Sequence, residues 1–260
     1  MKIFYLMFII VLYTNIAWAE SSSSKINFYS IGNSYLLYSP KLKNTRDYIW
    51  FKLAGDDNFG TAVSAGCDLL YEGIRVGNKI NGKILYYETD ISGSSEIKNI
   101  KASIDDSYIT INDDVVFSQC GLNIVYGSFE RIKISQKKYD TRISEVLNDG
   151  FVDAKENKKP NAEAFDNLIG HLGCGDVLKN IKVVNDIGFY LQQKKYSLNS
   201  ERILNKVLEC EPNRTVAYLN LGDSLYDQGK YIDARNAYEK YKKMMIKKGL
   251  SNQIPKRINN

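Results

Sequence analysis

The stretch "LNLGDSLYDQGKYIDARNAYEKY", Leu219–Tyr241, decides the fold of the C-terminal part of this chain. Apolar residues recur every three or four positions on both sides of Gly229, which is the spacing of two amphipathic helices. Gly229 stands where a left-handed residue would end the first helix. Gly222 and Ala234 carry little or no side chain, so the two helices can approach closely there. The stretch therefore predicts a tight helical hairpin.

The same pattern recurs earlier in the chain. Gly188 and Gly222 are 34 residues apart (222 − 188), which is the period of the tetratricopeptide repeat. The chain resembles that family over Ile181–Lys248, and the resemblance predicts two repeats, 181–214 and 215–248. Ser200, Leu204 and Leu225 depart from the commonest residue types of the family. The positions that carry the signature are Gly188, Pro212, Tyr218, Leu221, Gly222, Ala234 and Tyr238.

The resemblance implies a binding role without catalysis. Members of this family bind peptides or protein segments on the face that their first helices line. Asp223 and Asp227 would make that face acidic here, which favours a basic or neutral segment as the partner. The alternative is a helix face that only meets water. The partner-binding positions that the resemblance implies are Asn185, Phe189, Gln192, Leu219, Asp223, Tyr226 and Asp227.

Two repeats are fewer than the three that usually bury a continuous core. Other segments must then cover the two ends of the helical stack. We expect helices within Ala162–Asn180 to cover one end, and the last helix or the tail beyond Gly249 to cover the other. The alternative to a repeat is an ordinary helical hairpin.

The N-terminal half has a different period. Between Lys25 and Gln136, short runs rich in Tyr, Ile, Val and Phe are separated by Gly, Asn, Asp and Ser, which predicts an antiparallel sandwich or barrel. Asn81-Gly82 is the expected hairpin turn between Val76 and Ile84. The fold class is therefore α+β with segregated domains: a β domain over 20–136, a linker over 137–160 that holds at most a short helical turn, and a helical domain over 161–260.

The N-terminal stretch "MKIFYLMFIIVLYTNIAWAE" is typical of a cleaved secretory signal. Lys2 precedes an apolar run, and Ala17-Trp18-Ala19 supplies the small residues of a cleavage site after Ala19. The alternative, a membrane anchor, needs a longer apolar run to cross about 30 Å of hydrocarbon. We expect residues 1–19 to be removed and the protein to be periplasmic or secreted, without a stable membrane span.

The four cysteines fit an exported protein. An even number of cysteines in such a chain favours disulfides. Two fall in each half, so the simplest pairing is Cys67–Cys120 and Cys174–Cys210, and the alternative is four buried free thiols. Zinc is disfavoured, because no Cys-x-x-Cys occurs and the chain has one histidine. We expect no metal and no cofactor.

No catalytic motif is complete. "GNKINGKI", Gly77–Ile84, starts like a phosphate-binding loop, but it lacks the following Ser or Thr and the helix that such a loop requires. His171 is the single histidine, and its place beside Cys174 favours packing at a helix end. We therefore expect no enzymatic activity.

The charge of the chain is modest. The formal net charge of +5 falls to +4 once Lys2 is removed with the signal, which does not indicate nucleic acid as a partner. The C-terminal run is nevertheless basic, and it is a candidate for peripheral contact with an anionic membrane surface. Its basic residues are Lys240, Lys242, Lys243, Lys247, Lys248, Lys256 and Arg257.

Taken from the sequence, the function is protein–protein interaction in the cell envelope, as an adaptor or assembly factor. The alternative is a periplasmic inhibitor or immunity-type protein that acts through its β domain. Neither half of the sequence contains a motif that identifies the partner.

Overall fold

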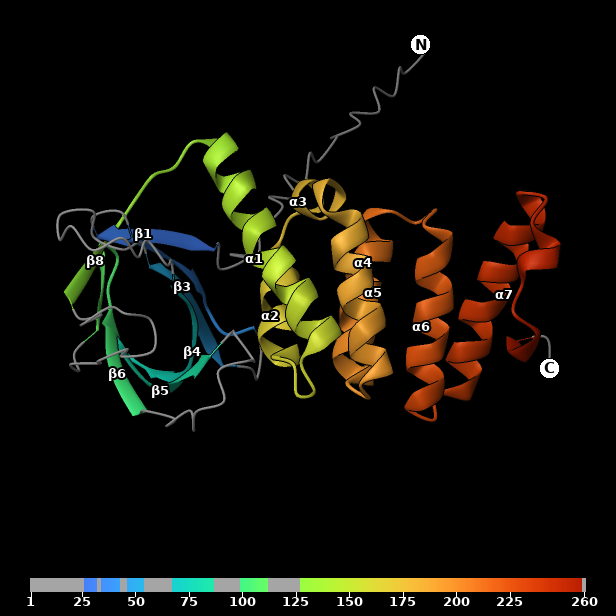
Figure 1. Ribbon diagram of the computed structural model, residues 1–260, viewed down its shortest axis with the longest axis horizontal. Helices are drawn as coiled ribbons and strands as arrows, with labels where there is room; N and C mark the ends of the chain where they lie inside the picture. Colours follow the sequence, from blue (N-terminus) through green and yellow to red (C-terminus); the bar gives the residue numbers. More distant parts are fainter. Residues whose placement is uncertain are drawn as a thin grey trace, which may run out of the picture.

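The computed structural model describes residues 26–31, 34–42, 46–53, 67–86, 99–111 and 127–258. The expected signal peptide and Cys120 lie outside these ranges, as does the side chain of Cys67. Figure 1 shows two parts side by side, a β-barrel and a row of helices that extends away from it. Within the described ranges, no helix is both long enough and apolar enough to cross a membrane.

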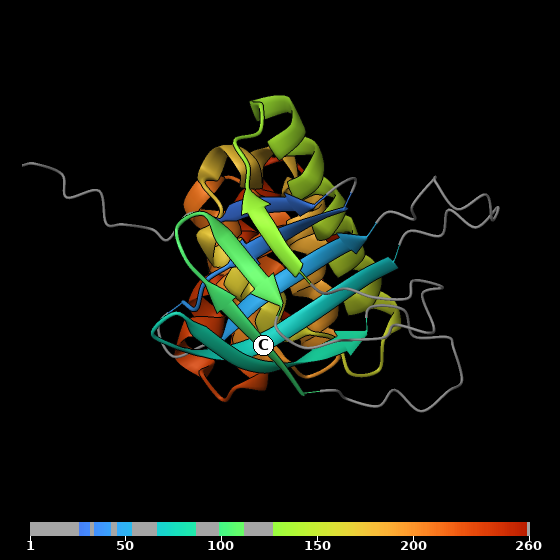
Figure 2. The same ribbon diagram turned by 90° about the vertical axis from the view of Figure 1, so that its left-hand side faces the viewer.

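The N-terminal part is a closed antiparallel barrel (Figure 2), so of the two expected alternatives the barrel is confirmed. Each strand pairs with the next along the chain, and β8 returns to pair with β1. Closure removes the open edges of the sheet. The strands are β1 (Asn27–Ile31), β2 (Ser34–Ser39), β3 (Asp47–Leu53), β4 (Cys67–Val76), β5 (Lys79–Tyr86), β6 (Asn99–Ile104), β7 (Tyr108–Ile111) and β8 (Gly127–Arg131).

The barrel is buried on both faces where it meets the helices. All residues from Tyr35 to Ser39 on β2 are buried, whereas β7 alternates between outward and inward positions. The outer face of β3 packs on α2, with the rings of Trp50 and Phe165 6.3 Å apart. The hydroxyl of Tyr35 donates to Glu145 on α1 at 2.9 Å. Residues of both parts therefore belong to one continuous hydrophobic core.

The expected hairpin turn at Asn81-Gly82 is wrong. The turn that joins β4 to β5 is Gly77-Asn78, where Gly77 has a φ of 61°. Gly82 lies inside β5, directly opposite Gly73 on β4. A Cβ on Gly82 would lie 2.0 Å from the carbonyl oxygen of Glu72. Close approach of two strands, rather than a turn, is the reason for glycine at this position.

The C-terminal part is helical. Its elements are α1 (Gln136–Glu156), α2 (Ala162–His171), α3 (Cys174–Lys179), α4 (Ile181–Gln193), α5 (Ser197–Cys210), α6 (Thr215–Asp227), α7 (Tyr231–Lys247) and the short 3₁₀ turns η3 (Ser251–Gln253) and η4 (Lys256–Ile258). The structure overturns the expected linker over 137–160, because α1 is a helix of 21 residues there. Its buried side includes Ile143, Val146, Leu147 and Ala154, which is a helical spacing.

The pairs α4–α5 and α6–α7 pack closely, and a glycine lies at the contact in each. A Cβ on Gly222 of α6 would lie 2.3 Å from the ring of Tyr238 on α7, and one on Gly188 of α4 would lie 2.9 Å from Leu204 on α5. The predicted close approach at Gly222 is thus confirmed. Gly150 on α1 faces the ring of Phe165 on α2 in the same way, at 2.4 Å. The α1–α2 pair is a third such contact that the sequence pattern did not reveal.

Other segments cover both ends of the row of helices. At one end α2 and α3 pack against α5, and α1 packs against α4. At the other end the segment after Gly249 packs against α7, where Ile258 joins a small core with Tyr241 and Met245. A disulfide joins Cys174 on α3 to Cys210 on α5, which confirms one of the two expected pairs. The other pair, Cys67–Cys120, lies outside the described side chains.

Candidate functional site

The face that the sequence assigns to a partner is formed by α4 and α6. Asn185 and Gln192 on α4 are buried, so they present no free surface to a partner. Phe189 and Leu219 are half-buried. Tyr226 is the most open of the aromatic side chains on this face, with 59 % of its surface exposed. The accessible part of the face is therefore at the C-terminal end of α6.

Asp227 connects the two hairpins and is not free. Its Oδ2 accepts a hydrogen bond from Nε2 of Gln192 at 2.8 Å. The ammonium of Lys195 lies 3.2 Å from the same oxygen, and the hydroxyl of Ser197 donates to it at 3.4 Å. All three partners come from the preceding helix pair, so this acid joins α6 to α4 and α5.

Asp223 is also engaged by the chain itself. Its Oδ1 accepts from the hydroxyl of Tyr238 at 2.9 Å, and its Oδ2 pairs with Nη2 of Arg257 at 2.6 Å. Burial, together with the hydrogen bond to this carboxylate, raises the pKa of Tyr238, so the phenol stays protonated and donates. The acidity expected for this face is thus balanced by residues of the same chain.

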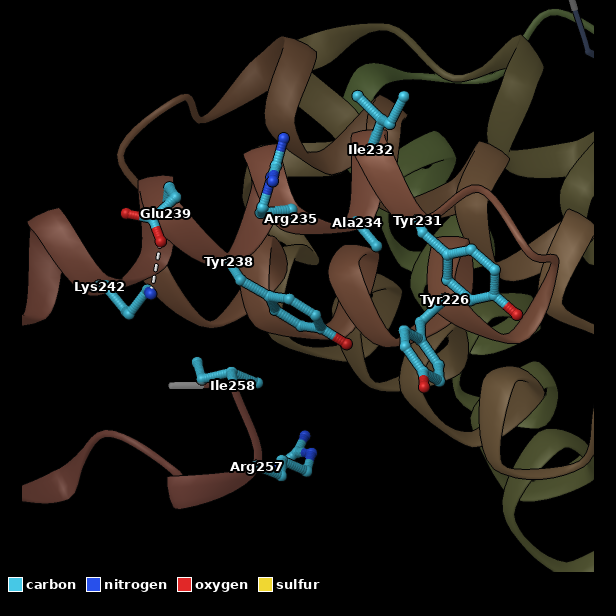
Figure 3. Close-up of a pocket in the computed structure, with 10 residues that line it drawn as sticks. All are labelled: Tyr226, Tyr231, Ile232, Ala234, Arg235, Tyr238, Glu239, Lys242, Arg257 and Ile258. Carbon is cyan, nitrogen blue, oxygen red and sulfur yellow. Dashed lines mark ion pairs between the residues drawn. The ribbon is translucent and has the colours of Figure 1, made fainter. Parts of the chain in front are cut away.

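A cavity of about 500 Å³ adjoins these residues. Figure 3 shows Tyr238 at its centre, with Arg257 and Ile258 below and the rings of Tyr226 and Tyr231 together at one side. Those two rings pack edge to face, 5.1 Å apart, and Tyr231 is 62 % exposed. Exposed aromatic side chains beside a cavity are typical of binding surfaces.

A second cavity of about 740 Å³ lies between the hairpins and the C-terminal segment. Its apolar lining includes Ile181, Leu219 and Leu250. Arg214 also lines it, and the buried Nε of this side chain has no hydrogen-bond partner in the described part of the chain. The second cavity adjoins Leu250 and Gln253 near the start of the segment that follows Gly249, whereas the first adjoins Arg257 and Ile258 near its end.

Four of the seven basic residues near the C-terminus are engaged within the chain. Lys240 lies over the ring of Tyr218 at 5.6 Å, Lys242 pairs with Glu239, and Nζ of Lys248 donates to Thr215 at 2.7 Å. The fourth is Arg257, on Asp223. Fewer basic groups are therefore available for a membrane surface than the sequence suggested.

His171 lies at the C-terminal end of α2 and bonds to the backbone before β3. Its Nε2 donates to the carbonyl oxygen of Pro40 at 2.8 Å, which ties α2 to the segment after β2. Burial lowers the pKa of this histidine. Among the described residues, no three acidic, histidine or cysteine side chains gather as a metal site.

Sequence reasoning missed Arg257 as part of this site. It appeared there only as one charge of a basic run, although it follows Asp223 by 34 residues, one repeat length. Tyr231 was missed as well, because its ring joins Tyr226 only across the turn at Gly229.

The chain was compared with family models, curated proteins and solved structures. None of them matches it.

Proposed function

We propose that this is an exported protein whose helical part, a tetratricopeptide-like module, binds a segment of another protein in the cell envelope. In this role it acts as an adaptor or assembly factor. The observation that carries the proposal is that contacts, and not only residue types, recur after 34 residues. Gly188 packs on Leu204, and Gly222 packs on Tyr238, so both members of each contact shift by 34 positions.

The backbone conformation at the C-terminal ends of α4 and α6 also recurs after 34 residues. Lys195 after α4 and Gly229 after α6 are both left-handed, with φ of 68° and 74°. The next amide returns to the helix in both cases, from Tyr196 to Leu191 and from Lys230 to Leu225. Lysine rarely adopts this conformation, so its presence at the equivalent position supports a repeated backbone rather than a chance likeness of sequence.

The site offers what a protein segment needs for binding. Tyr226 and Tyr231 supply exposed aromatic area, which contributes much of the affinity at protein interfaces. The Cys174–Cys210 disulfide supports an oxidising compartment.

The test is crosslinking of the intact protein in its native compartment. A double variant, Asp223→Lys with Tyr226→Ala, removes the acid and the aromatic ring of the site. A matched control, Glu156→Lys with Tyr108→Ala, makes the same changes at an exposed acid of α1 and an exposed ring of β7. We expect a partner that the first variant loses and the control retains.

Retention of the partner by both variants would contradict a binding role for this face. The function would then move to the barrel, and the inhibitor or immunity-type alternative would be tested next. Its assay is inhibition of envelope hydrolases and co-exported toxins by the purified chain.

A further inference from the structure

The C-terminal segment lies on the face that the sequence assigns to a partner. Gly249, with a φ of 72°, turns the chain back after α7, and residues 250–258 then run alongside that helix (Figure 1). Leu250, Ile254 and Ile258 join one small core with residues of α6 and α7. Leu219 belongs to this core and is one of the residues expected to bind a partner.

The segment also forms an ion pair with Asp223, an acidic residue of that face. Arg257 places its guanidinium on Asp223 at 2.6 Å. The carboxyl side chain is 16 % exposed and the arginine 55 % exposed, so the acid lies inside the face and the base reaches it from the rim. The next residue, Ile258, is buried. A basic residue followed by an aliphatic one therefore matches this site in charge and in polarity.

The fit of the segment is incomplete. Its backbone hydrogen bonds after Leu250 are local, from Gln253, Ile254 and Ile258 to residues three positions earlier. Within the described ranges, the Arg257–Asp223 pair is the only hydrogen bond or ion pair that joins residues 251–258 to a helix. The cavities of about 500 and 740 Å³ adjoin the segment, one beside Arg257 and the other beside Leu250.

We propose that residues 250–258 are a displaceable internal occupant of the partner site, and that the partner carries a segment of the same chemistry. That segment places an arginine on Asp223, an aliphatic residue directly after it, and a second aliphatic residue three positions before it. The inference rests on the proposed function and specifies the partner of the same face. A single ion pair, whose arginine reaches in from the solvent-exposed rim, and a few apolar contacts hold the occupant, so a better-fitting segment can replace it.

The test uses the full chain and a fluorescent peptide with the sequence LSNQIPKRI, residues 250–258. The internal segment competes with the peptide for the site. The apparent affinity of the wild type is therefore reduced by the fraction of molecules in which the segment has left the site. Arg257→Glu with Ile258→Glu opens the site, and we expect that variant to bind the peptide at least about tenfold more tightly than the wild type. A further Asp223→Asn change in the opened protein should abolish the gain.

A milder variant controls for the possibility that the double substitution unfolds the protein. Arg257→Gln removes the ion pair and keeps Ile258, so it should bind the peptide more tightly than the wild type by a smaller factor. Circular dichroism checks that each variant keeps the unfolding midpoint of the barrel and helices. Equal peptide binding by the wild type and both folded variants would overturn the inference, as would a gain that survives Asp223→Asn.

The same variants separate this inference from the proposed function. In one outcome, Asp223→Lys loses a native partner, while the wild type and the opened variant capture it equally well. That result would uphold the proposed function and overturn the displaceable segment. Peptide binding that follows the pattern above, without any native partner, would uphold the segment as occupant and overturn the proposed function. A wild-type dimer that Arg257→Gln dissociates would make a second copy the occupant and overturn the partner part of the inference.

Discussion

Three glycines leave room for a large side chain of a neighbouring helix. Gly222 is recognisable from the sequence because Ala234 and Tyr238 follow it at the spacing of a known repeat. Gly150 has the same role against Phe165, but it precedes Gly188 by 38 residues (188 − 150) rather than 34. A search at one fixed period therefore misses it, although the contact is as close.

Replacement of Gly222 by alanine should destabilise the protein by about 1–3 kcal/mol, because the new methyl group would overlap the ring of Tyr238. The matched control is Gly175→Ala on α3, where nothing lies within 4 Å of the added Cβ. That change should be neutral or stabilise by up to about 1 kcal/mol. Urea unfolding of both variants measures the difference, and equal midpoints would contradict close packing at Gly222.

The single histidine gives stability a defined pH dependence. Burial lowers the pKa of His171 from 6.5, so the unfolded chain binds a proton before the folded protein does. The full contribution of the neutral ring is present above pH 6.5, and it is lost as pH falls through the lowered pKa of the folded state. Asp153 and Asp166, whose pKa values burial raises, act in the opposite direction at lower pH.

We expect His171→Gln to remove the part of the decline in unfolding free energy that lies just below pH 6.5. Urea unfolding at pH 7.5, 6.5 and 5.5 tests this, because the other titrating groups are common to the two proteins. Parallel pH profiles would show that the ring is protonated as readily in the folded state as in the unfolded one.

At the scale of elements, α1 shows that a charged segment can be helical although its composition predicts a linker. The charged run near Asp153 and Pro160 covers only the end of α1 and the loop that follows. The apolar residues Ile143, Val146 and Leu147 upstream already have helical spacing. Even Asp153 is part of the fold, since it is buried and accepts the backbone amide of Asn161 at 2.7 Å. The helical spacing of the apolar residues in α1 was therefore a better predictor than the charge of the segment.

The Cys174–Cys210 disulfide should stabilise the helical part by about 4 kcal/mol on the chain-entropy model, because it closes a separation of 36 residues. The double variant Cys174→Ala with Cys210→Ala is therefore expected to unfold at a clearly lower temperature. Calorimetry compares it with the wild type under oxidising conditions. An unchanged midpoint would contradict a loss of chain entropy in the unfolded state as the source of stabilisation.

At the scale of the whole molecule, the sequence predicted the division into a β part and an α part, and of the two disulfides it predicted, Cys174–Cys210 is confirmed. It did not decide between a sandwich and a closed barrel, because the pairing of β1 with β8, which closes the barrel, has no local signal in the sequence. Nor did it show that the barrel and helices share one core, since the contacts of Trp50 with Phe165 depend on the tertiary fold. For the same reason it missed Arg257 on Asp223.

A fragment of residues 181–248 should not fold cooperatively on its own. It lacks α1 and α2, which cover α4 and α5, and it lacks Ile258 of the C-terminal core. Circular dichroism with urea titration should show a shallow transition, whereas residues 20–260 should unfold steeply. A steep monomeric transition of the fragment would mean that two helix pairs suffice as an independent unit.

The double burial of the barrel strands has a consequence for mutational tolerance. On β6, β7 and β8, charged substitutions should be tolerated at every second position, because only one face is buried. On β2 and β3 every described side chain from Tyr35 to Ser39 and from Asp47 to Trp50 is buried, so neither set of alternating positions is free. Sequence drift in related chains should therefore concentrate on one half of the barrel wall, and the conserved half would mark the side on which the helices lie.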